Sequence, residues 1–296
     1  MLCAKLGKYR IKLLGMKKLF TYITTILIIF TSTALFAQQN EVVIKTVQPE
    51  KKSRKLSFGL YGGSNLAWIR SDTKGYNGDG VRLGLNYGLV TDFSLANNDN
   101  YFLSTGLVIS NIGGKMDNPS AFTLEDTAGA PYLVPSRVGV TYSVRQLEIP
   151  ISLKMKTAEI GYIKYFGQFG ISPGYALRVT REGNEAYTGG TEAIEESSAS
   201  DYLSIFRLGV LAGAGVEYNL TGNTNLMVGL SYNGAFTNIL KGQEAGSDKR
   251  RAFEVDDNGT TDVSKVQIGA EPYKVSSGPE LISRSDFVSL NIAIFF

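Results

Sequence analysis

The chain has 296 residues, 43% of them hydrophobic, which excludes a disordered protein but leaves open one large all-β domain or two ordinary ones. It holds one cysteine and no histidine, so Cys or His zinc sites, Ser-His-Asp hydrolysis and Cys-His proteolysis each lack a required residue. The net charge of +3 is misleading, because the first 37 residues carry six basic residues and no acid. Beyond them 24 basic residues face 27 acids, a net charge of −3, and no nucleic-acid partner is expected.

The N-terminal region has the order of a secretion signal. From Met16 it runs MKKLFTYITTILIIFTSTALFAQQN, with two lysines, an apolar stretch and then small residues. This order predicts a signal peptide over residues 1–37, with Met16 as the true start and cleavage after Ala37, or alternatively after Ala34. An uncleaved anchor helix is the competing interpretation, since Leu19–Phe36 is just long enough to span a bilayer.

The next segment, residues 38–55, is polar, lacks sustained periodicity and ends in a run of basic residues. We interpret it as a flexible periplasmic linker. Residues 56–296 are then predicted to form one barrel domain.

Alternation with period two runs through this domain and predicts strands with unlike faces. In Val81–Leu95 the odd positions are mostly apolar, while the even positions Arg82, Gly84, Asn86, Gly88, Asp92 and Ser94 are polar or glycine. The same division recurs in Tyr101–Gly113, Leu226–Ile239 and the C-terminal segment. Eight such segments are predicted, the other four being Leu56–Arg70, Val138–Met155, Ile160–Val179 and Tyr202–Leu220.

One segment breaks its own alternation. In Val138–Met155 the apolar residues are even up to Val144 and odd from Leu147 onward. A β-bulge near Arg145 or Gln146 would produce this change.

The connections alternate between short and long. Tight turns are expected at Ala96–Asn100, Lys156–Glu159 and Thr221–Thr224, whereas the other connections are long and polar. This rhythm is typical of an all-β, eight-stranded, antiparallel up-and-down transmembrane barrel, and an even strand number places both termini on the short-turn, periplasmic side. The long loops are predicted at Ser71–Asp79, Gly114–Arg137, Thr180–Asp201 and Leu240–Ser285.

A soluble barrel or sandwich also alternates with period two. The predicted segments are longer than the ~5 to 6 residues of an average soluble strand and reach the ~9 to 11 that a tilted membrane strand needs. Aromatic residues also gather toward segment ends, as in the girdles of membrane barrels. Both observations favour an outer-membrane location, with outer-membrane lipid as a partner.

Several stretches resemble a known family. The opening FGLYGGSNLAWI, the middle LEIPISLKMK with YFGQFGISPGYALR, and the end at Phe296 look like the PorT-like outer-membrane β-barrel family of Bacteroidetes, and TALFAQQ is similar to signal ends of that phylum. The resemblance covers 56–296 and implies fold more than function, although the namesake acts in type IX protein secretion. It also implies that the barrel assembly machinery recognises the C-terminal pattern of Val288, Leu290, Ile292, Ile294 and Phe296.

Charged residues at lumen-facing positions form a second candidate site. Because charges excluded from water need partners, the simplest interpretation is a network of ion pairs that fills a narrow barrel, and a selective pore is the alternative. The predicted network consists of Arg82, Asp92, Glu148, Lys154, Lys164, Arg178, Arg207 and Glu217.

Other chemistry finds little support in the sequence. Adjacent acids at Glu195–Glu196 and Asp256–Asp257 are more often solvated surface than catalytic pairs, and the acidic stretches 192–201 and 254–262 lack EF-hand spacing for Ca²⁺. We therefore expect no cofactor, no metal and no enzymatic activity. The expected role is surface interaction or envelope assembly, with envelope or secretion proteins as partners; type IX secretion and a small-solute or lipid-handling barrel are the alternatives.

Overall fold

The computed structural model describes residues 55–95, 100–200, 202–221, 224–240, 252–267, 274–275 and 281–296. The predicted signal peptide and all but the last residue of the predicted linker lie outside these residues, as do parts of two predicted turns. Within the described residues, no helix is long and apolar enough to cross a membrane. The elements are β1 (Leu56–Ser71), β2 (Asn77–Ser94), β3 (Tyr101–Glu125), β4 (Pro131–Glu148), β5 (Ile151–Lys156), β6 (Ile163–Tyr187), β7 (Gly190–Ser198), β8 (Phe206–Thr221), β9 (Thr224–Ala235), η1 (Val263–Lys265), β10 (Val266–Gln267), β11 (Lys274–Val275) and β12 (Ser283–Phe295).

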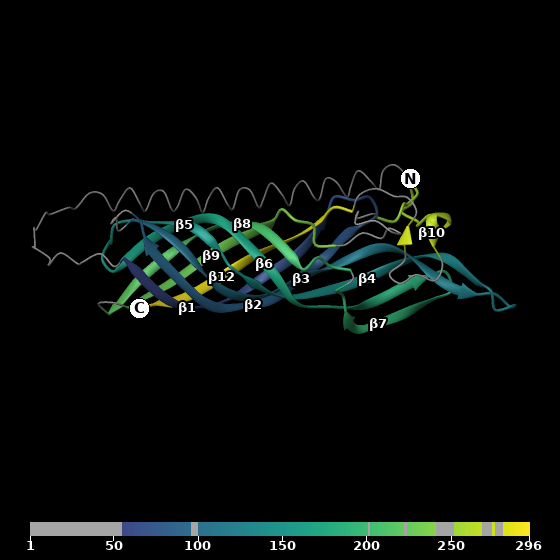
Figure 1. Ribbon diagram of the computed structural model, residues 1–296, viewed down its shortest axis with the longest axis horizontal. Helices are drawn as coiled ribbons and strands as arrows, with labels where there is room; N and C mark the ends of the chain where they lie inside the picture. Colours follow the sequence, from purple (N-terminus) through teal and green to yellow (C-terminus); the bar gives the residue numbers. More distant parts are fainter. Residues whose placement is uncertain are drawn as a thin grey trace, which may run out of the picture. The chain divides into compact units, whose positions relative to one another are not determined.

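Antiparallel pairing closes the described strands into a barrel (Figure 1). The ring runs β1–β2–β3, then β4 and β5 in one position, then β6–β8–β9–β12 and back to β1. β4 and β5 share a position because Ile149 and Pro150 interrupt one long strand, and proline has no amide hydrogen to donate to a ladder. The ring therefore has the eight positions that the sequence predicts.

The two faces of the wall differ as the alternation requires. On β2, Leu83, Leu85 and Leu89 are 58–69% exposed on the outside, whereas Asn86 and Asp92 are buried inside. Exposed apolar side chains of the other ring strands extend this surface into a belt around the barrel, which we call the apolar band. Such a surface suits lipid and not water.

The two ends of the barrel are unlike. The end that holds Leu56 and Phe295, where short turns join the strands, is called the terminal end here; the opposite one is the hairpin end. At the hairpin end β3 and β4 continue as a paired ribbon to Glu125 and Pro131, and β6 and β7 form a second hairpin (Figure 1).

These hairpins correct two predicted loops. Gly114–Arg137 and Thr180–Asp201 are mostly strand, with ladders from Gly114–Tyr142 to Glu125–Pro131 and from Thr180–Ser198 to Tyr187–Gly190. The sequence did not indicate them because, beyond the apolar band, neither face meets lipid and the apolar alternation disappears. Likewise β2 already begins at Asn77, within the predicted loop Ser71–Asp79.

The β-bulge predicted near Arg145 or Gln146 is not found in β4; a bulge lies instead on its partner strand β6. The β4–β6 register shifts between Arg145 and Gln146, whose partners are Arg178 and Ala176, so Leu177 of β6 is the extra residue. In β4 the even residues stay buried throughout, from Ser136 to Glu148. Its apolar residues change parity because the interior itself changes from polar to apolar toward the hairpin end.

That apolar interior caps the barrel. Side chains of the long strands pack against the connection after β7 and against residues 252–266, where Phe253 is 5% exposed. Together they bury an apolar cluster at the hairpin end, which we call the hairpin-end core. Its larger members include Ile69, Tyr76, Ile112, Met116, Val140, Tyr142, Leu203, Leu240, Phe253 and Phe287.

Candidate functional site in the barrel lumen

Four charged side chains form a compact cluster in the terminal half of the lumen, which we call the lumen cluster. Lys154 Nζ lies 2.9 Å from Asp92 Oδ2 and 3.6 Å from Glu217 Oε1. Lys156 Nζ lies 3.1 Å from Asp92 Oδ2 and 2.9 Å from Glu217 Oε2. All four side chains are at least 92% buried, and each cation contacts both anions. The lumen cluster is therefore neutral as a unit.

Strand geometry and aromatic rings hold the lumen cluster in place. Lys154 and Lys156 are two residues apart on β5 and so point to the same face, while the acids come from β2 and β8. The Nζ of Lys156 lies 4.2 Å from the ring centre of Phe102, and that of Lys154 lies 4.8 Å from the ring of Phe295. These cation–π contacts add attraction where water is excluded.

A second group surrounds Glu148 in the middle of the lumen. Its carboxylate accepts hydrogen bonds from Gln146 Nε2 at 2.6 Å and from Ser172 Oγ at 2.8 Å. Arg207 donates to Asn233 Oδ1 at 2.8 Å and to the Ser285 carbonyl oxygen at 2.9 Å. Asn233 Nδ2 in turn lies 3.5 Å from Glu148 Oε2, so an amide links the two opposite charges.

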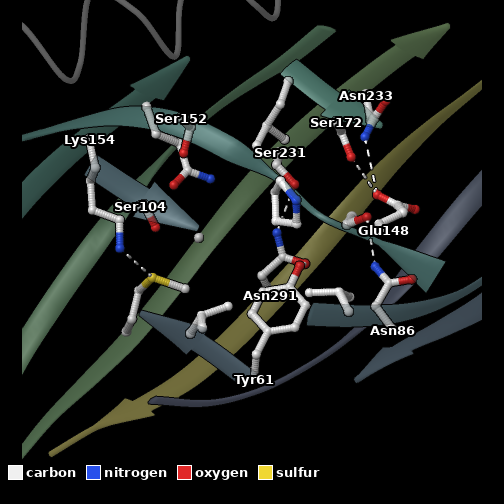
Figure 2. Close-up of a pocket in the computed structure, with 18 of the residues that line it drawn as sticks. Tyr61, Asn86, Ser104, Glu148, Ser152, Lys154, Ser172, Ser231, Asn233 and Asn291 are labelled. Atoms are coloured by element: carbon white, nitrogen blue, oxygen red, sulfur yellow. Dashed lines mark hydrogen bonds between the residues drawn. The ribbon is translucent and has the colours of Figure 1, made fainter. Parts of the chain in front are cut away.

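Amide and hydroxyl side chains fill the remaining width of the lumen. Asn291 Nδ2 donates to Ser231 Oγ at 2.7 Å, and its Oδ1 accepts from the Tyr61 hydroxyl at 2.6 Å. Asn86 donates to Ser289 Oγ at 3.0 Å. Figure 2 shows these groups pointing toward one another from different strands. Each bond joins two strands of the ring, and the Asn86–Ser289 bond links β2 to β12, which are separated by β1.

Little space is left between these groups. The cavity they line has a volume of about 60 Å³, room for a few water molecules at ~10 to 15 Å³ each. Small-molecule sites usually measure ~300 to 1,000 Å³. The lumen cluster lies on the terminal side of this cavity and the hairpin-end core on the other side. The described interior is therefore a packed core, and it does not form a channel.

The predicted network is only partly assembled. Asp92, Lys154 and Glu217 come together in the lumen cluster, and Glu148 and Arg207 meet through Asn233. The other three predicted residues, Arg82, Lys164 and Arg178, lie elsewhere. Arg82 is half-buried and donates to the Ile112 carbonyl oxygen at 3.4 Å, and Lys164 lies 3.8 Å from Glu159 at the terminal rim.

The lumen position predicted for Arg178 is wrong. Its side chain is 68% exposed and lies 3.5 Å from Glu196. Counting alternate residues along β6 places Arg178 inside, but the extra residue Leu177 reverses the alternation and turns Arg178 outward.

Lys156 is the charged lumen residue that sequence reasoning missed. The predicted turn Lys156–Glu159 begins at this residue, but in the structure Lys156 is the last residue of β5, two residues beyond Lys154 and therefore on the same face. That spacing was the available signal. The residues of the predicted assembly pattern lie on the outward face of β12 or just after it, and their recognition by the assembly machinery stays a prediction.

The loop acids have ordinary partners. Asp256 Oδ1 accepts from the backbone amides of Asn258 and Thr260, and Asp257 lies 3.1 Å from Lys74. In the part of the chain that the structure describes, no group of three or more His, Cys, Asp or Glu side chains could hold a metal ion.

Comparison with known protein families identifies the family of this chain. The model of the outer membrane protein beta-barrel domain matches residues 36–241, about two-thirds of the chain. The chain belongs to this family. It is thus an outer-membrane β-barrel, and its exposed apolar band is the surface that meets lipid. No curated protein matches the chain.

Solved structures of other outer-membrane barrels are similar to it in a general way. OprG of Pseudomonas aeruginosa is 10% identical, with a TM-score of 0.38 over 83% of this chain and 98% of that one. Ail, the attachment invasion locus protein of Yersinia pestis, is 9% identical, with a TM-score of 0.29 over 82% and 100%. The protease OmpT of Escherichia coli is 9% identical, with a TM-score of 0.31 over 81% and 94%. The names of the last two describe an attachment invasion locus protein and a protease, and neither description is carried over to this chain.

Proposed function

We propose that this protein is a closed, non-enzymatic outer-membrane barrel whose hairpin end faces the cell exterior and acts by binding other surface or envelope components. The observation that carries the proposal is the filled interior. Among the described residues, buried ion pairs and the hairpin-end core leave cavities of only about 60 and 70 Å³. The work of such a barrel falls to the part outside the apolar band.

The hairpin end is built to present a surface. The β3–β4 ribbon and the β6–β7 hairpin extend past the apolar band, and stacking joins them, with the rings of Phe122 and Tyr187 4.0 Å apart and 3° from parallel. The two hairpins therefore form one ordered unit. A surface that is already ordered binds more tightly than a flexible one, because no free energy is lost in ordering it on contact.

Cross-linking in intact cells tests this proposal. A photo-reactive amino acid at Thr123 or Thr191, near the two hairpin tips, should give discrete adducts with another envelope or surface molecule. The same group at Leu83, on the lipid-facing wall, is the control and should give none. If neither tip gave adducts and the purified barrel showed steady conductance, the proposed binding role would be wrong and a transport role would take its place.

Sidedness is tested separately. The only cysteine, Cys3, lies in the segment predicted to be removed, so single cysteines can be introduced without interference. Ala128 in the β3–β4 turn and Ala158 at the terminal end are both exposed. A membrane-impermeant maleimide added to intact cells should label Ala128→Cys and spare Ala158→Cys; the reverse pattern would place the termini outside.

The narrower assignment, a PorT-like component of type IX protein secretion, rests on sequence resemblance. A deletion strain tests it: loss of secreted type IX cargo, restored by the wild-type gene, would support the assignment. Normal secretion in the deletion strain would rule out the type IX assignment and leave the proposed binding role unaffected.

A further inference from the structure

Two arginines lie side by side on the outer wall. Arg145 of β4 and Arg178 of β6 are direct cross-strand partners, and both side chains are exposed. Toward the terminal end, the following outward residues are apolar. They are the half-buried Leu147 and then Ile149, 42% exposed, after Arg145, and Leu177, 52% exposed, beside Arg178. The arginine pair therefore marks the edge of the apolar band at the hairpin end, the level at which lipid headgroups meet the barrel.

The bulge in β6 creates this pair. Without the extra residue Leu177, Arg178 would follow Gly174 and Ala176 to the inner face. With it, Leu177 and Arg178 both point outward and Arg178 is aligned with Arg145. Bulges often serve to redirect one side chain in this way.

The arrangement is unfavourable for the protein alone, because like charges directly opposite each other destabilise a sheet. Arg145 Nε donates to the neutral Asn111 Oδ1 at 3.2 Å, and no described carboxylate forms an ion pair with Arg145. Arg178 reaches Glu196 only at 3.5 Å, with both side chains more than half exposed. An exposed ion pair of this kind contributes little. An anion between the two guanidinium groups would remove the repulsion.

A groove begins beside Arg178, where β6 leaves β8. The last β6–β8 pair is Tyr175 with Phe206, after which β6 pairs with β7. The groove has a volume of about 530 Å³. Its wall next to the apolar band is apolar, with Leu177 and Ile205. Its other wall carries the hydroxyl groups of Thr180, Ser197 and Ser198, together with Glu196, the carboxylate that lies 3.5 Å from Arg178. An amphiphile fits this division, with chains toward the band and a polar part toward the hydroxyl groups.

We propose that Arg145 and Arg178 bind the phosphate of an anionic lipid in the leaflet around the hairpin end, with the polar part of that lipid beside the groove. Guanidinium groups bind phosphate oxygens in pairs of parallel hydrogen bonds, and two of them at the band edge supply charge and geometry together. A membrane lipid is favoured over a soluble anion because the site opens onto the apolar band. This site does not depend on the binding role proposed above.

Lipid retention by the full-length protein tests the site. The protein is reconstituted in vesicles of phosphatidylcholine with one-fifth phosphatidylglycerol, extracted in mild detergent and weighed intact by native mass spectrometry. The wild type should retain phosphatidylglycerol over phosphatidylcholine. Arg145→Gln/Arg178→Gln removes two basic residues and should lower that preference by about thirtyfold, which corresponds to ~2 kcal/mol at ~1.4 kcal/mol per tenfold. Lys74→Gln/Arg284→Gln removes the same charge from an exposed and a half-buried position at the hairpin end and should retain lipid as the wild type does.

Three outcomes would overturn the proposal. They are equal retention by the arginine double variant, equal loss in the lysine–arginine control, and displacement of the lipid by millimolar inorganic phosphate, which would make the site one for soluble anions. If the double variant does not fold, Arg145→Gln alone carries the same test, with a smaller loss of retention expected.

Discussion

At the residue scale, the lumen cluster contributes to stability as a neutral unit of four charges. Lys154, Lys156, Asp92 and Glu217 offset one another's charge away from water, and each cation contacts both acids. Burying an ion is expensive unless a partner replaces its hydration, so the loss of one member costs more than the contact it made. The remaining three would carry an unbalanced charge.

Glu217→Ala is therefore expected to lower the free energy of unfolding by about 3 to 5 kcal/mol. Urea unfolding of the folded barrel in lipid vesicles, followed by gel mobility, would measure it. The control is Glu192→Ala at an exposed hairpin position, which should change little. Equal stability of Glu217→Ala and the wild type would mean that water reaches the lumen cluster.

Glu185, at the hairpin end, predicts a pH dependence. Burial raises the pKa of its carboxyl group above the usual value, although the Ser136 hydroxyl donates to it. For an acid with a raised folded-state pKa, stability is full below the unfolded pKa and falls as pH rises through the folded value. The β6–β7 hairpin should therefore become more open to hydrogen exchange as pH rises from about 4 into the range above the raised pKa.

The comparison with Glu185→Gln isolates this effect. The amide does not titrate, so in this variant amide exchange, corrected for its intrinsic pH dependence, should stay flat over the same range. An identical profile in both proteins would show that another group controls the opening.

At the element scale, close strand approach is decided at particular glycines. β2 and β3 shift register between Gly80 and Asn86, and a Cβ at Gly84 would lie 1.8 Å from the Asn111 carbonyl oxygen. Backbone atoms cannot move away as a flexible side chain can. The wall at this point thus requires a residue without a side chain.

Gly84→Ala should destabilise the barrel by about 3 kcal/mol or prevent folding, because overpacking against backbone displaces a whole strand. Gly167→Ala is the matched control, since a Cβ there meets nothing within 4 Å. The folded fraction after refolding into vesicles measures both variants. Equal folded fractions would show that β2 and β3 can separate at low cost.

At the scale of the whole molecule, two different kinds of side-chain packing fill the barrel, one polar and one apolar. The terminal half is filled by ion pairs and amides, and the hairpin end is covered by the hairpin-end core. An eight-position barrel is only just wide enough for its own side chains, and in the part of the chain that the structure describes these side chains fill the interior.

Purified protein in planar bilayers should accordingly show no steady conductance. Brief, irregular openings at high voltage would be compatible with a closed barrel, whereas reproducible ohmic channels of the wild type would contradict it. The lumen-cluster variant Glu217→Ala provides a second measurement: it should unfold more readily than the wild type without gaining a channel.

The sequence by itself determined the all-β class, the eight strand positions and the lipid-facing side of each strand, because alternation is a local property wherever one face meets lipid and the other does not. It also marked Asp92, Glu148, Lys154, Arg207 and Glu217 as inward charges, since each lies on an alternating segment.

Only the tertiary structure decided the rest. The hairpins beyond the apolar band do not face lipid, so their sequence shows no apolar alternation, and loops are predicted where the structure has paired strands. The position of the bulge depends on which strand carries the extra residue, and the single residue Leu177 moves Arg178 from the lumen to the outer wall. The pairing of each cation with two acids depends on strands that meet only when the ring closes, since Asp92 and Glu217 are far apart in the chain. Local alternation indicates the face of most residues, a bulge reverses it for residues such as Arg178, and closure of the ring fixes their partners.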